Sequence, residues 1–395
     1  MTAPVVLFDR PMRAGKRHLG GTHRAVSLTS TLARARRLYR RAGVTRVGEL
    51  TGLDDLGVPV FAAIRPQSRS LSSQQGKGTS ALAAEVSAAM EAVETWHAET
   101  ARPTLRGRTV AELPGPACAV RALPRQRALP RAARLDWSRG WDLLAQRWCW
   151  VPFEAVHLDL VFAPGYRPIF DVSSNGLASG NHPLEAVLHG LCEVIERDAE
   201  AQWRQTGSQR RLILDTVDDP ACQALITRLT GRGTRLAAWD LTSDVEVPVV
   251  AVALLEPPDQ PAWRGLGVYQ GFGAHPSPAI ALARALTEAA QTRLTYIAGG
   301  RDDFFPADYA HASDPTVVAR TWAELVLVDS EPVDFAALPD LATPTLHGDL
   351  HAVLDALRAA GVDQALAVDL SRPRTGLSVV RTLIPGRATA LEYLG

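Results

Sequence analysis

Apolar residues recur at the spacing of an α-helix along four long segments of this chain. The most regular segment is 81–99, ALAAEVSAAMEAVETWHAE, and the same period recurs in 188–203, 279–299 and 350–361. Positions three and four apart carry mostly Ala, Leu, Val or Ile, which gives each helix an apolar face. The pattern therefore predicts four helices that pack on a hydrophobic core.

A shorter helix is predicted near the N-terminus. Ser27 or Thr29 can cap its first turn, and Gly43 ends it. Its apolar face consists of Leu32, Ala35 and Leu38. Its many arginines are expected on a solvated face.

Short apolar runs bounded by turn residues predict the strands. They lie at 58–66, 148–162, 234–242, 247–257, 364–371 and 377–386. The segment 102–137 contains scattered prolines and arginines and is expected to be irregular and at the surface. Because helices and strands alternate along the chain, the predicted fold class is α/β or a mixed α+β fold.

Three polar, glycine-containing segments stand directly before helices. They are QSRSLSSQQGKGTS at 67–80, SSNGLASGNHPLEA at 173–186 and YQGFGAHPSP at 269–278. Their Gly, Ser, Asn and Pro content predicts loops. Each loop leads into a helix that carries acidic residues, so the chain uses one local arrangement three times without a sequence repeat of fixed period.

Composition and charge restrict the class of protein. The chain has 395 residues, of which 46% are hydrophobic and 21% charged, and a formal net charge of zero. A folded globular protein is expected, with no nucleic-acid partner and no membrane association. The N-terminus lacks a hydrophobic signal core and no apolar run could span a bilayer, so a cytoplasmic location is expected. The four cysteines form no CxxC pair, which argues against a zinc ribbon or a redox motif.

Two pairs of glutamates stand out on the apolar helices. Glu91 and Glu94 are three residues apart, as are Glu193 and Glu196, so each pair shares one helix face. Taken alone, either pair could be solvated. A buried helix cannot keep unpaired carboxylates without a large penalty, however, and carboxylates are the ligands that Mg²⁺ prefers. The two pairs therefore predict a site for Mg²⁺ between two core helices.

A nucleotide triphosphate bound to that Mg²⁺ would need cationic side chains and loop N–H groups around its phosphates. The loops before the helices offer Lys77, Asn175 and Asn181. The chain contains neither a Walker A motif nor a GxGxxG motif, so a P-loop or a dinucleotide-binding fold is not indicated.

The ordered segments QGKGTSALAAEVSAAMEAVE, SSNGLASGNHPLEAVLHGLCEVIERDAEAQW and GFGAHPSPAIALARALTEAAQTRL resemble the YcaO family. The resemblance runs from about residue 20 to the C-terminus. It implies a YcaO-type fold of repeated sheet-and-helix layers, with an ATP site between acidic helices. It also implies an ATP- and Mg²⁺-dependent enzyme that phosphorylates a peptide backbone amide. A nucleophile then attacks the former carbonyl carbon: a Cys, Ser or Thr side chain gives an azoline, sulfide a thioamide, and an amine an amidine.

The resemblance also assigns site residues. The metal ligands that it implies are Glu91, Glu94, Glu193 and Glu196. The ATP contacts are expected from Arg24, Thr31, Lys77, Ser87, Asn181, Glu185, Arg197 and Arg284. Of these, Lys77 is proposed from its position in the loop before the helix and not from the resemblance. Arg197 has two open roles, as a contact to substrate or as a group that orients a carboxylate. On the third helix Arg284, Glu288, Gln291 and Arg293 are candidates, and one of the two arginines is expected to meet the phosphates. Thr95 follows Glu94 where the second helix has Arg197, so the two helices are not equivalent.

Two regions are expected within the chain. Residues 1–59 form an N-terminal segment whose helix contributes to the ATP site, and residues 60–395 form the YcaO-type ATP-binding catalytic domain. The N-terminal segment resembles members that act with a TfuA-type partner protein and install thioamides. The ending RTLIPGRATALEYLG lacks the alternating prolines common in azoline-forming members, and no fused leader-binding domain is recognised.

Thioamidation of a ribosomally made peptide or protein is therefore the expected reaction, with a separate sulfur donor and a homodimeric enzyme. Azoline formation and amidine formation remain alternatives within the family. A sulfur-transfer accessory factor for ribosome or tRNA modification and a non-catalytic peptide-binding scaffold are alternatives of other classes. Cys192 is expected to pack the helix core rather than carry sulfur. The general base is not assigned, and structural or polar loop roles are expected for His23, His182, His189 and His275.

Overall fold

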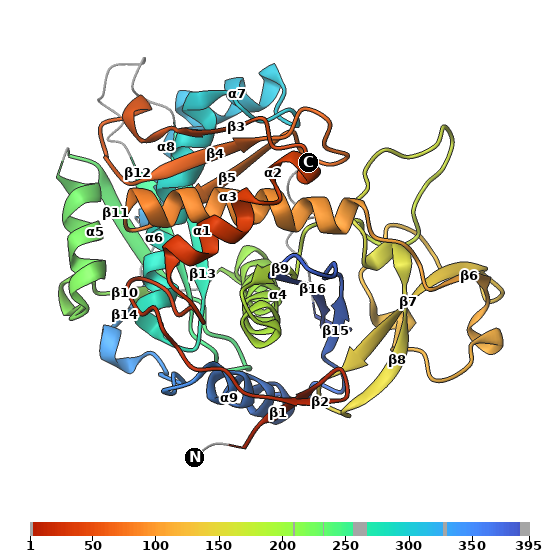
Figure 1. The fold of residues 1–395 in the computed structure, drawn as a ribbon. Helices are drawn as coiled ribbons and strands as arrows, with labels where there is room; N and C mark the ends of the chain where they lie inside the picture. The colour runs from red at the N-terminus through yellow and green to blue at the C-terminus, as the bar shows by residue number, and fades with distance from the viewer. Residues whose placement is uncertain (1–2, 208–209, 232, 256–266, 327–329, 388–395) are drawn as a thin grey trace.

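The computed structural model describes residues 3–207, 210–231, 233–255, 267–326 and 330–387. Three sheets and the helices that cover them surround helix α4 (Pro183–Thr206), which Figure 1 shows nearly end-on at the centre. Helix α3 (Ala81–Glu99) crosses above it in this view, and α9 (Leu346–Ala359) lies below. The helix that carries Glu193 and Glu196 is thus surrounded by other elements.

The predicted mixed fold class is confirmed, and the strand pairing makes it mostly antiparallel. A three-stranded sheet has the order β3-β4-β5, with strands Arg46–Glu49, Val60–Ile64 and Ser73–Lys77. A five-stranded sheet has the order β13-β12-β11-β10-β14, with strands Val268–Ala274, Val249–Leu255, Arg235–Asp240, Arg210–Leu212 and Glu331–Val333. Only the pair β10–β14 is parallel among the described strand pairs.

The third large sheet has the order β6-β7-β15-β16-β9, and β8 pairs with β7. Its strands are β6 Leu105–Arg108, β7 Leu135–Asp142, β8 Arg147–Pro152, β9 Leu177–Gly180, β15 Leu366–Asp369 and β16 Ser378–Leu383. A hairpin of β1 (Val5–Leu7) and β2 (Arg10–Met12) lies beside α9. The remaining helices are α1 Leu28–Arg36, α2 Tyr39–Ala42, α5 Pro220–Thr230, α6 Pro278–Ala298, α7 Pro306–Ala312 and α8 Pro315–Val326.

The prediction of three glycine-rich loops was wrong in its central residues, because each segment contains a buried strand. Strand β5 leads into α3, β9 leads into α4 and β13 leads into α6. Each strand also packs against the helix that follows it. The repeated arrangement is therefore a strand followed by a helix.

Close packing of helix on strand explains the glycines in these segments. A Cβ atom on Gly76 of β5 would lie 1.9 Å from the backbone nitrogen of Ala88 in α3. A Cβ atom on Gly273 of β13 would lie 2.1 Å from the carbonyl oxygen of Ala281 in α6. Heavy atoms cannot approach so closely. Glycine is present because the helix backbone lies directly on the strand, and a turn is not the reason.

The helix predicted to end at Gly43 forms, but it is divided. Helix α1 begins after the cap Ser27, whose hydroxyl accepts a hydrogen bond from the Ser30 N–H, and ends at Arg36. The Leu38 N–H then bonds to the Ala35 carbonyl, a tighter i→i+3 contact that separates α1 from α2. Gly43 ends α2 with φ 75°, a left-handed conformation that glycine adopts readily.

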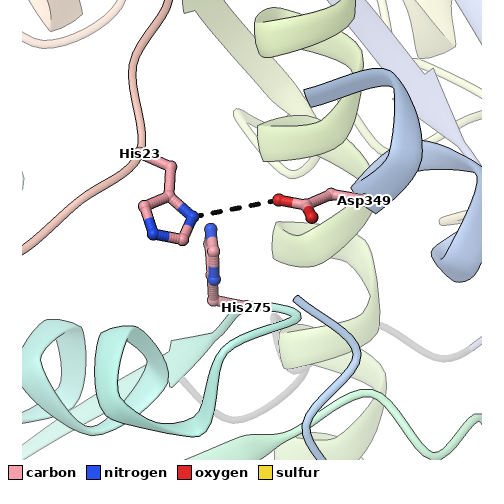
Figure 2. A group of neighbouring side chains, drawn as sticks. All are labelled: His23, His275 and Asp349. Atoms are coloured by element: carbon pink, nitrogen blue, oxygen red, sulfur yellow. Dashed lines mark ion pairs between the residues drawn. The ribbon is translucent and has the colours of Figure 1, made fainter. Parts of the chain in front are cut away.

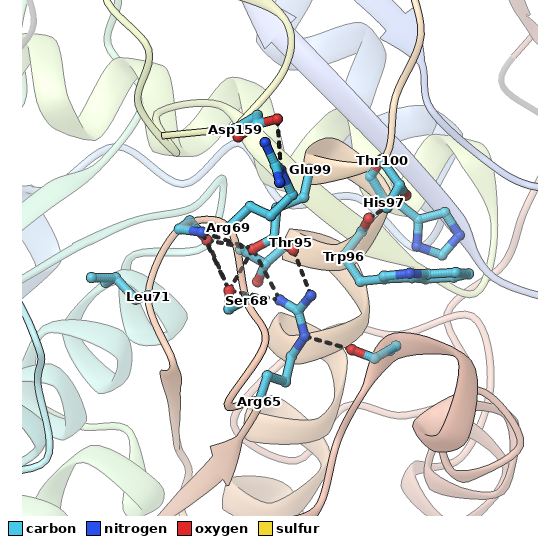
Figure 3. Close-up of polar contacts among 12 residues, drawn as sticks. Arg65, Ser68, Arg69, Leu71, Thr95, Trp96, His97, Glu99, Thr100 and Asp159 are labelled. Carbon is cyan, nitrogen blue, oxygen red and sulfur yellow. Dashed lines mark hydrogen bonds and ion pairs between the residues drawn. The ribbon is translucent and has the colours of Figure 1, made fainter. Parts of the chain in front are cut away.

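The C-terminal turn of α3 is fixed by a buried ion pair between Glu99 and Arg65 (Figure 3). Both side chains are almost fully buried, at 3% exposure for Arg65 and 2% for Glu99. The Ser70 hydroxyl and N–H donate to the same carboxylate at 2.7 and 3.1 Å. Arg65 also donates to the carbonyl oxygen of Ala42 at 2.8 Å. The network ties α3 to the loop between β4 and β5 and to the end of α2.

The hydrophobic positions predicted from the pattern form the core. Leu188, Leu191 and Cys192 of α4 are buried in one cluster with strands β11 and β12 and with α9. The burial of Cys192 confirms its packing role, and burial raises the pKa of its thiol to about 12. Among the described residues, no helix combines the length and the apolar character that a bilayer crossing requires. Glu256 and Pro257, the end of one predicted strand, and the tail after Arg387 lie outside the described residues.

Candidate active site

Helices α3, α4 and α6 enclose a cavity of about 1030 Å³ together with the chain around residues 20–31. The four predicted metal ligands, Glu91, Glu94, Glu193 and Glu196, all line it. The predicted ATP contacts Arg24, Thr31, Lys77, Ser87, Asn181, Glu185, Arg197 and Arg284 line it as well. Residues separated by up to 260 positions are thus brought to one space by the packing of three strand–helix units and the N-terminal segment.

The carboxylates in this cavity differ in exposure, from Glu91, which is exposed to the cavity, to Glu196, which is buried. Burial raises the pKa of Glu91 and of Glu193 to about 7, and it raises the pKa of Glu94 further. Burial also raises the pKa of Glu196, although the nearby Arg284 opposes this. Glu91 is reached by solvent from the cavity even though protein surrounds it, and Glu196 is only 2% exposed. Loss of solvation is thus the main penalty on these carboxylates, and the neighbouring cations offset only part of it.

The donor set fits Mg²⁺. Within the described chain, no hydrogen bond or ion pair is made by the side-chain oxygens of Glu91 or Glu193. By contrast, Glu196 accepts the Ala274 N–H at 2.9 Å and lies 3.8 Å from Arg284 Nη2. Hydrogen bonds from Ser179 lower the pKa of Glu94 but do not offset its burial. Some of these carboxylate oxygens are fixed by hydrogen bonds and others have no partner in the protein. Such a set suits a hard divalent cation that is also coordinated by phosphate.

The N-terminal segment forms one wall of the cavity. The Ala25 N–H donates to Glu185 Oε2 at 2.8 Å, and Arg24 Nη1 lies 3.7 Å from Glu185 Oε1. The Asn181 amide donates to Thr31 Oγ1 at 3.0 Å and to Glu185 Oε1 at 3.4 Å. Glu185 thus holds the segment in place, while Arg24 and Thr31 remain on the cavity surface.

Strand β3 belongs to the sheet of β4 and β5, so the expected division after residue 59 falls between two paired strands. The N-terminal residues are thereby continuous with the sheet that supports α3.

Lys77 forms an ion pair with Glu288 of α6. Burial raises the pKa of Glu288, but Lys77 and Arg197 outweigh it, so the net pKa is lowered and the carboxylate is ionised. Arg284 donates to Nε2 of His189 at 2.9 Å. Burial and the nearby Arg284 hold the pKa of His189 well below its usual value, so this ring is neutral. His189, for which a structural role was expected, lines the cavity.

The two candidate arginines of α6 are separated by the structure. Arg284 lines the cavity, whereas Arg293 is buried and pairs with Asp54 at 2.8 Å between Nη1 and Oδ2. Arg293 is not part of the cavity lining, so of the two arginines Arg284 is the one that stays a candidate for the phosphate contact. Nine residues along a helix rotate a side chain by two and a half turns, which explains why the two arginines face opposite sides.

Arg197 lines the cavity and pairs with Glu200 at 2.9 Å. Burial lowers the pKa of Arg197, but Glu196 and Glu200 raise it more, so the guanidinium stays protonated. These contacts agree with the role of orienting carboxylates and leave the contact to substrate open.

Sequence reasoning missed Arg301, Gln75 and Ser179 as cavity residues. Arg301 follows α6, and its charge lowers the pKa of Glu91 against the effect of burial. No motif marks it, because the sequence around Arg301 is a charged loop like many others. Ser179 and Gln75 lie in segments that were predicted to be loops, and because both strands are buried on both faces, no alternation along the sequence indicated them.

His23, His275 and Asp349 form a compact group behind the cavity wall (Figure 2). His23 Nδ1 lies 3.8 Å from Asp349 Oδ2, and Lys16 Nζ lies 2.7 Å from the same oxygen. His275 Nδ1 accepts the Ser277 N–H at 2.9 Å, so the neutral ring carries its proton on Nε2. A metal ligand needs a free lone pair, but Nε2 of His275 carries a proton and the Asp349 carboxylate is already paired with Lys16. The group is therefore a hydrogen-bonded ionic network and not a metal site. The group links the N-terminal segment to α9 and to the loop before α6.

Comparison with known proteins agrees with this geometry. The family model described as YcaO cyclodehydratase, ATP- and Mg²⁺-binding, matches residues 75–388. A protein of Rhizobium leguminosarum bv. trifolii, described as an uncharacterized protein in the tfuA 3′ region, is 39% identical over 375 residues. The match covers 92% of this chain and 88% of that protein.

Two solved structures share the fold. A YcaO protein from Methanopyrus kandleri, bound with AMPPCP and Mg²⁺, is 26% identical with a TM-score of 0.76, and the match covers 96% of both chains. A heterocyclase in complex with substrate and cofactor has a TM-score of 0.79 at 23% identity, a likeness of fold alone. The chain spans 54% of that heterocyclase. The family resemblance and the predicted cofactors, ATP and Mg²⁺, are confirmed by these findings.

Proposed function

Because this chain belongs to the YcaO family of ATP- and Mg²⁺-binding cyclodehydratases, we propose that it activates a peptide backbone amide with ATP and that sulfide then replaces the amide oxygen. The observation that carries the ATP-dependent part is the cavity with its buried glutamates, two of which have uncommitted carboxylates. The choice of sulfide rests on the similarity to the protein in the tfuA 3′ region and on the N-terminal segment.

The proposed roles follow from position and charge. Glu91, Glu94, Glu193 and Glu196 would hold Mg²⁺, which neutralises phosphate charge and aligns the γ-phosphate. Arg24 lies in the segment before α1 and Arg284 lies on α6; both line the cavity and would bind phosphate oxygens. Lys77 is committed to Glu288, so it would act by keeping that carboxylate ionised and fixed. Ser87 would offer a hydrogen bond to the nucleotide, whereas Thr31 and Asn181 hydrogen-bond to each other and would shape the wall beside it.

The reaction is balanced with ATP and sulfide as the co-substrates. The amide oxygen attacks the γ-phosphorus, ADP leaves, and the C–O bond becomes a C–OPO₃ bond whose carbon is electrophilic. Sulfide adds to that carbon, phosphate leaves with the former amide oxygen, and the thioamide forms without any change in oxidation state. The arginines and glutamates contribute by positioning and by stabilising charge, since phosphoryl transfer needs little covalent help from protein.

Ring closure by a neighbouring Cys, Ser or Thr side chain is the second candidate, because the matching family model is described as a cyclodehydratase. It uses the same activated amide and differs only in the nucleophile. No cysteine among the four described is placed to carry sulfur, since all are buried, which is why we propose an external donor. We also propose a TfuA-type partner and a homodimer.

The deciding experiment is mass spectrometry of candidate peptides co-expressed with this protein and its genomic neighbours. Replacement of oxygen by sulfur adds about 16 Da, whereas cyclodehydration removes about 18 Da. The gain supports thioamidation, and the loss would replace it with azoline formation. Light scattering of the purified protein tests the dimer.

A substitution pair tests the metal ligands themselves. Glu193→Gln keeps the size of the side chain but removes a charge from the cavity, so Mg²⁺-ATP binding and peptide modification should fall by at least a hundredfold. Glu85→Gln on α3 is the matched control, because Glu85 pairs with Arg36 and is not part of the cavity lining. Calorimetric titration with Mg²⁺ and a non-hydrolysable ATP analogue gives the readout. Equal affinity in both variants would remove Glu193 from the site.

A further inference from the structure

Positive charge is concentrated in one segment of a chain that is neutral as a whole. Residues 102–136 carry two acidic residues, Glu112 and Asp136, against eight arginines. The arginines are Arg102, Arg106, Arg108, Arg121, Arg125, Arg127, Arg131 and Arg134, and all eight are exposed. Such a segregated charge produces a local field that the net charge hides.

Part of this segment forms a groove. A second cavity of about 620 Å³ is lined by residues 121–129 together with Asp171, Gln205 and Arg387. Arg125, Gln126 and Asp171 also line the cavity of the glutamates, so the groove adjoins the candidate active site. A chain lying in the groove would therefore reach the site where an amide is activated.

The arginines of the groove differ in how far their charge is neutralised. Arg387 is matched by Asp244 at 2.7 Å and by Asp198 at 3.1 Å. Arg127 donates to the carbonyl oxygen of Pro168 at 3.2 Å, which leaves its charge unmatched. In the described part of the chain, no carboxylate lies within ion-pair distance of Arg121 or Arg125. Asp171 is the one carboxylate among the described residues that line the groove, so Arg121, Arg125 and Arg127 leave it with a net positive charge.

We propose that this groove binds an acidic stretch of the substrate polypeptide next to the amide that is modified. The inference rests on the proposed function, since it assigns the groove to the substrate of the same site. A polypeptide suits the groove better than a nucleic acid because none of the residues that line it is aromatic, and single strands are held largely by base stacking. Pro124 and Leu129, which are half-buried, can contact aliphatic parts of a peptide.

The test measures binding without ATP, so it does not depend on the reaction. Fluorescein-labelled octapeptides of alternating Glu and Gly, Gln and Gly, or Lys and Gly are titrated with the full chain, and anisotropy is recorded at low and at high salt. The Glu peptide should bind at least tenfold more tightly than the other two and weaken with salt. An eight-nucleotide oligo-dT is the fourth probe.

A double variant locates the contact. Arg121→Gln with Arg127→Gln should weaken the Glu peptide at least tenfold, while the thermal shift caused by Mg²⁺-ATP is unchanged. The control is Arg106→Gln with Arg108→Gln, two exposed arginines of β6 outside the groove. Equal losses in both double variants, binding that ignores peptide charge, or a preference for oligo-dT would each overturn the proposal. If the Glu peptide binds as expected but no peptide is modified, the result would count against the proposed function and not against the groove.

Discussion

At the scale of single residues, the glutamates of α3 and α4 lower the stability of the folded protein when they are ionised and no cation is bound. Burial raises the pKa of Glu91 and Glu193 to about 7, from an ordinary value of 4.5. The folded metal-free protein therefore binds more protons than the unfolded chain between these two pH values. A site built this way is less stable when empty and ionised, and it is stabilised by the cation it binds.

A pH dependence follows from the direction of these shifts. Stability from a raised carboxyl pKa is fully present below about pH 4.5 and is lost as the pH rises to about 7. The melting temperature in EDTA should therefore fall across this window, and the increase caused by Mg²⁺-ATP should be larger at pH 7.5 than at pH 5.5. Scanning calorimetry at both pH values measures the two effects.

The double variant Glu91→Gln, Glu193→Gln serves as the control for this pH dependence. It should reduce the fall in melting temperature with rising pH in EDTA, while Glu94 and Glu196 still titrate, and be more stable than the parent protein at pH 7.5. An unchanged profile would show that these two groups do not titrate as described.

At the scale of elements, glycines determine how closely each helix approaches its strand. Gly76 of β5 and Gly273 of β13 lie directly against helix backbone, so α3 and α6 bring their carboxylate-bearing faces to a fixed position. The composition of these segments predicted loops because glycine and serine are typical of turns. Hydrophobic alternation could not correct the prediction, since Gly and Ser supply no apolar side chains to alternate.

The substitution Gly76→Ala tests this close packing. The new methyl group would meet the backbone of Ala88, which cannot rotate away, so the free energy of unfolding should fall by about 3 kcal/mol. Gly52→Ala is the control, because a Cβ atom there meets nothing within 4 Å. Urea unfolding of both variants gives the comparison, and a loss below that of Gly52→Ala would contradict the contact.

The buried pair at the end of α3 provides a second test at this scale. Glu99→Gln leaves the Arg65 guanidinium buried without its counter-charge, which should lower the free energy of unfolding by about 3–5 kcal/mol. Glu324→Gln in α8 removes an exposed pair with Arg320 and should cost less than about 1 kcal/mol. Chemical denaturation measures both, and comparable losses would show that the network in Figure 3 does not anchor the helix.

At the scale of the whole molecule, the N-terminal segment completes a cavity whose other walls come from distant parts of the chain. The group of His23, His275 and Asp349 in Figure 2 holds this segment against α9, and Lys16 adds an ion pair to Asp349. Arg24 follows His23 directly and lines the cavity. Contacts outside the cavity thereby position a residue inside it.

The substitution Asp349→Asn tests this coupling. It leaves the Lys16 ammonium, only 4% exposed, without a carboxylate, so the N-terminal segment should loosen. Mg²⁺-ATP affinity should fall at least fivefold, and limited proteolysis should cut within residues 13–25 sooner. Asp355→Asn on the same helix is the control, since its pair with Arg358 is exposed. If the segment is cleaved early but Mg²⁺-ATP affinity is unaltered, the position of the segment does not affect ATP binding.

The sequence by itself determined the helices, the mixed class and the positions of the four glutamates. Helical periodicity depends on near neighbours along the chain, and a carboxylate on an apolar helix face is visible without knowing what the face meets. The family resemblance added the nucleotide and the order of the segments that surround it.

Only the tertiary structure decided which residues share the cavity. It placed Arg284 inside and Arg293 outside, turned three expected loops into strands, and brought Arg301 and His189 to the site. These outcomes depend on contacts between segments far apart in the chain. Such contacts depend on how closely the backbones of two elements pack and on which buried charges pair, and neither can be read from a single sequence.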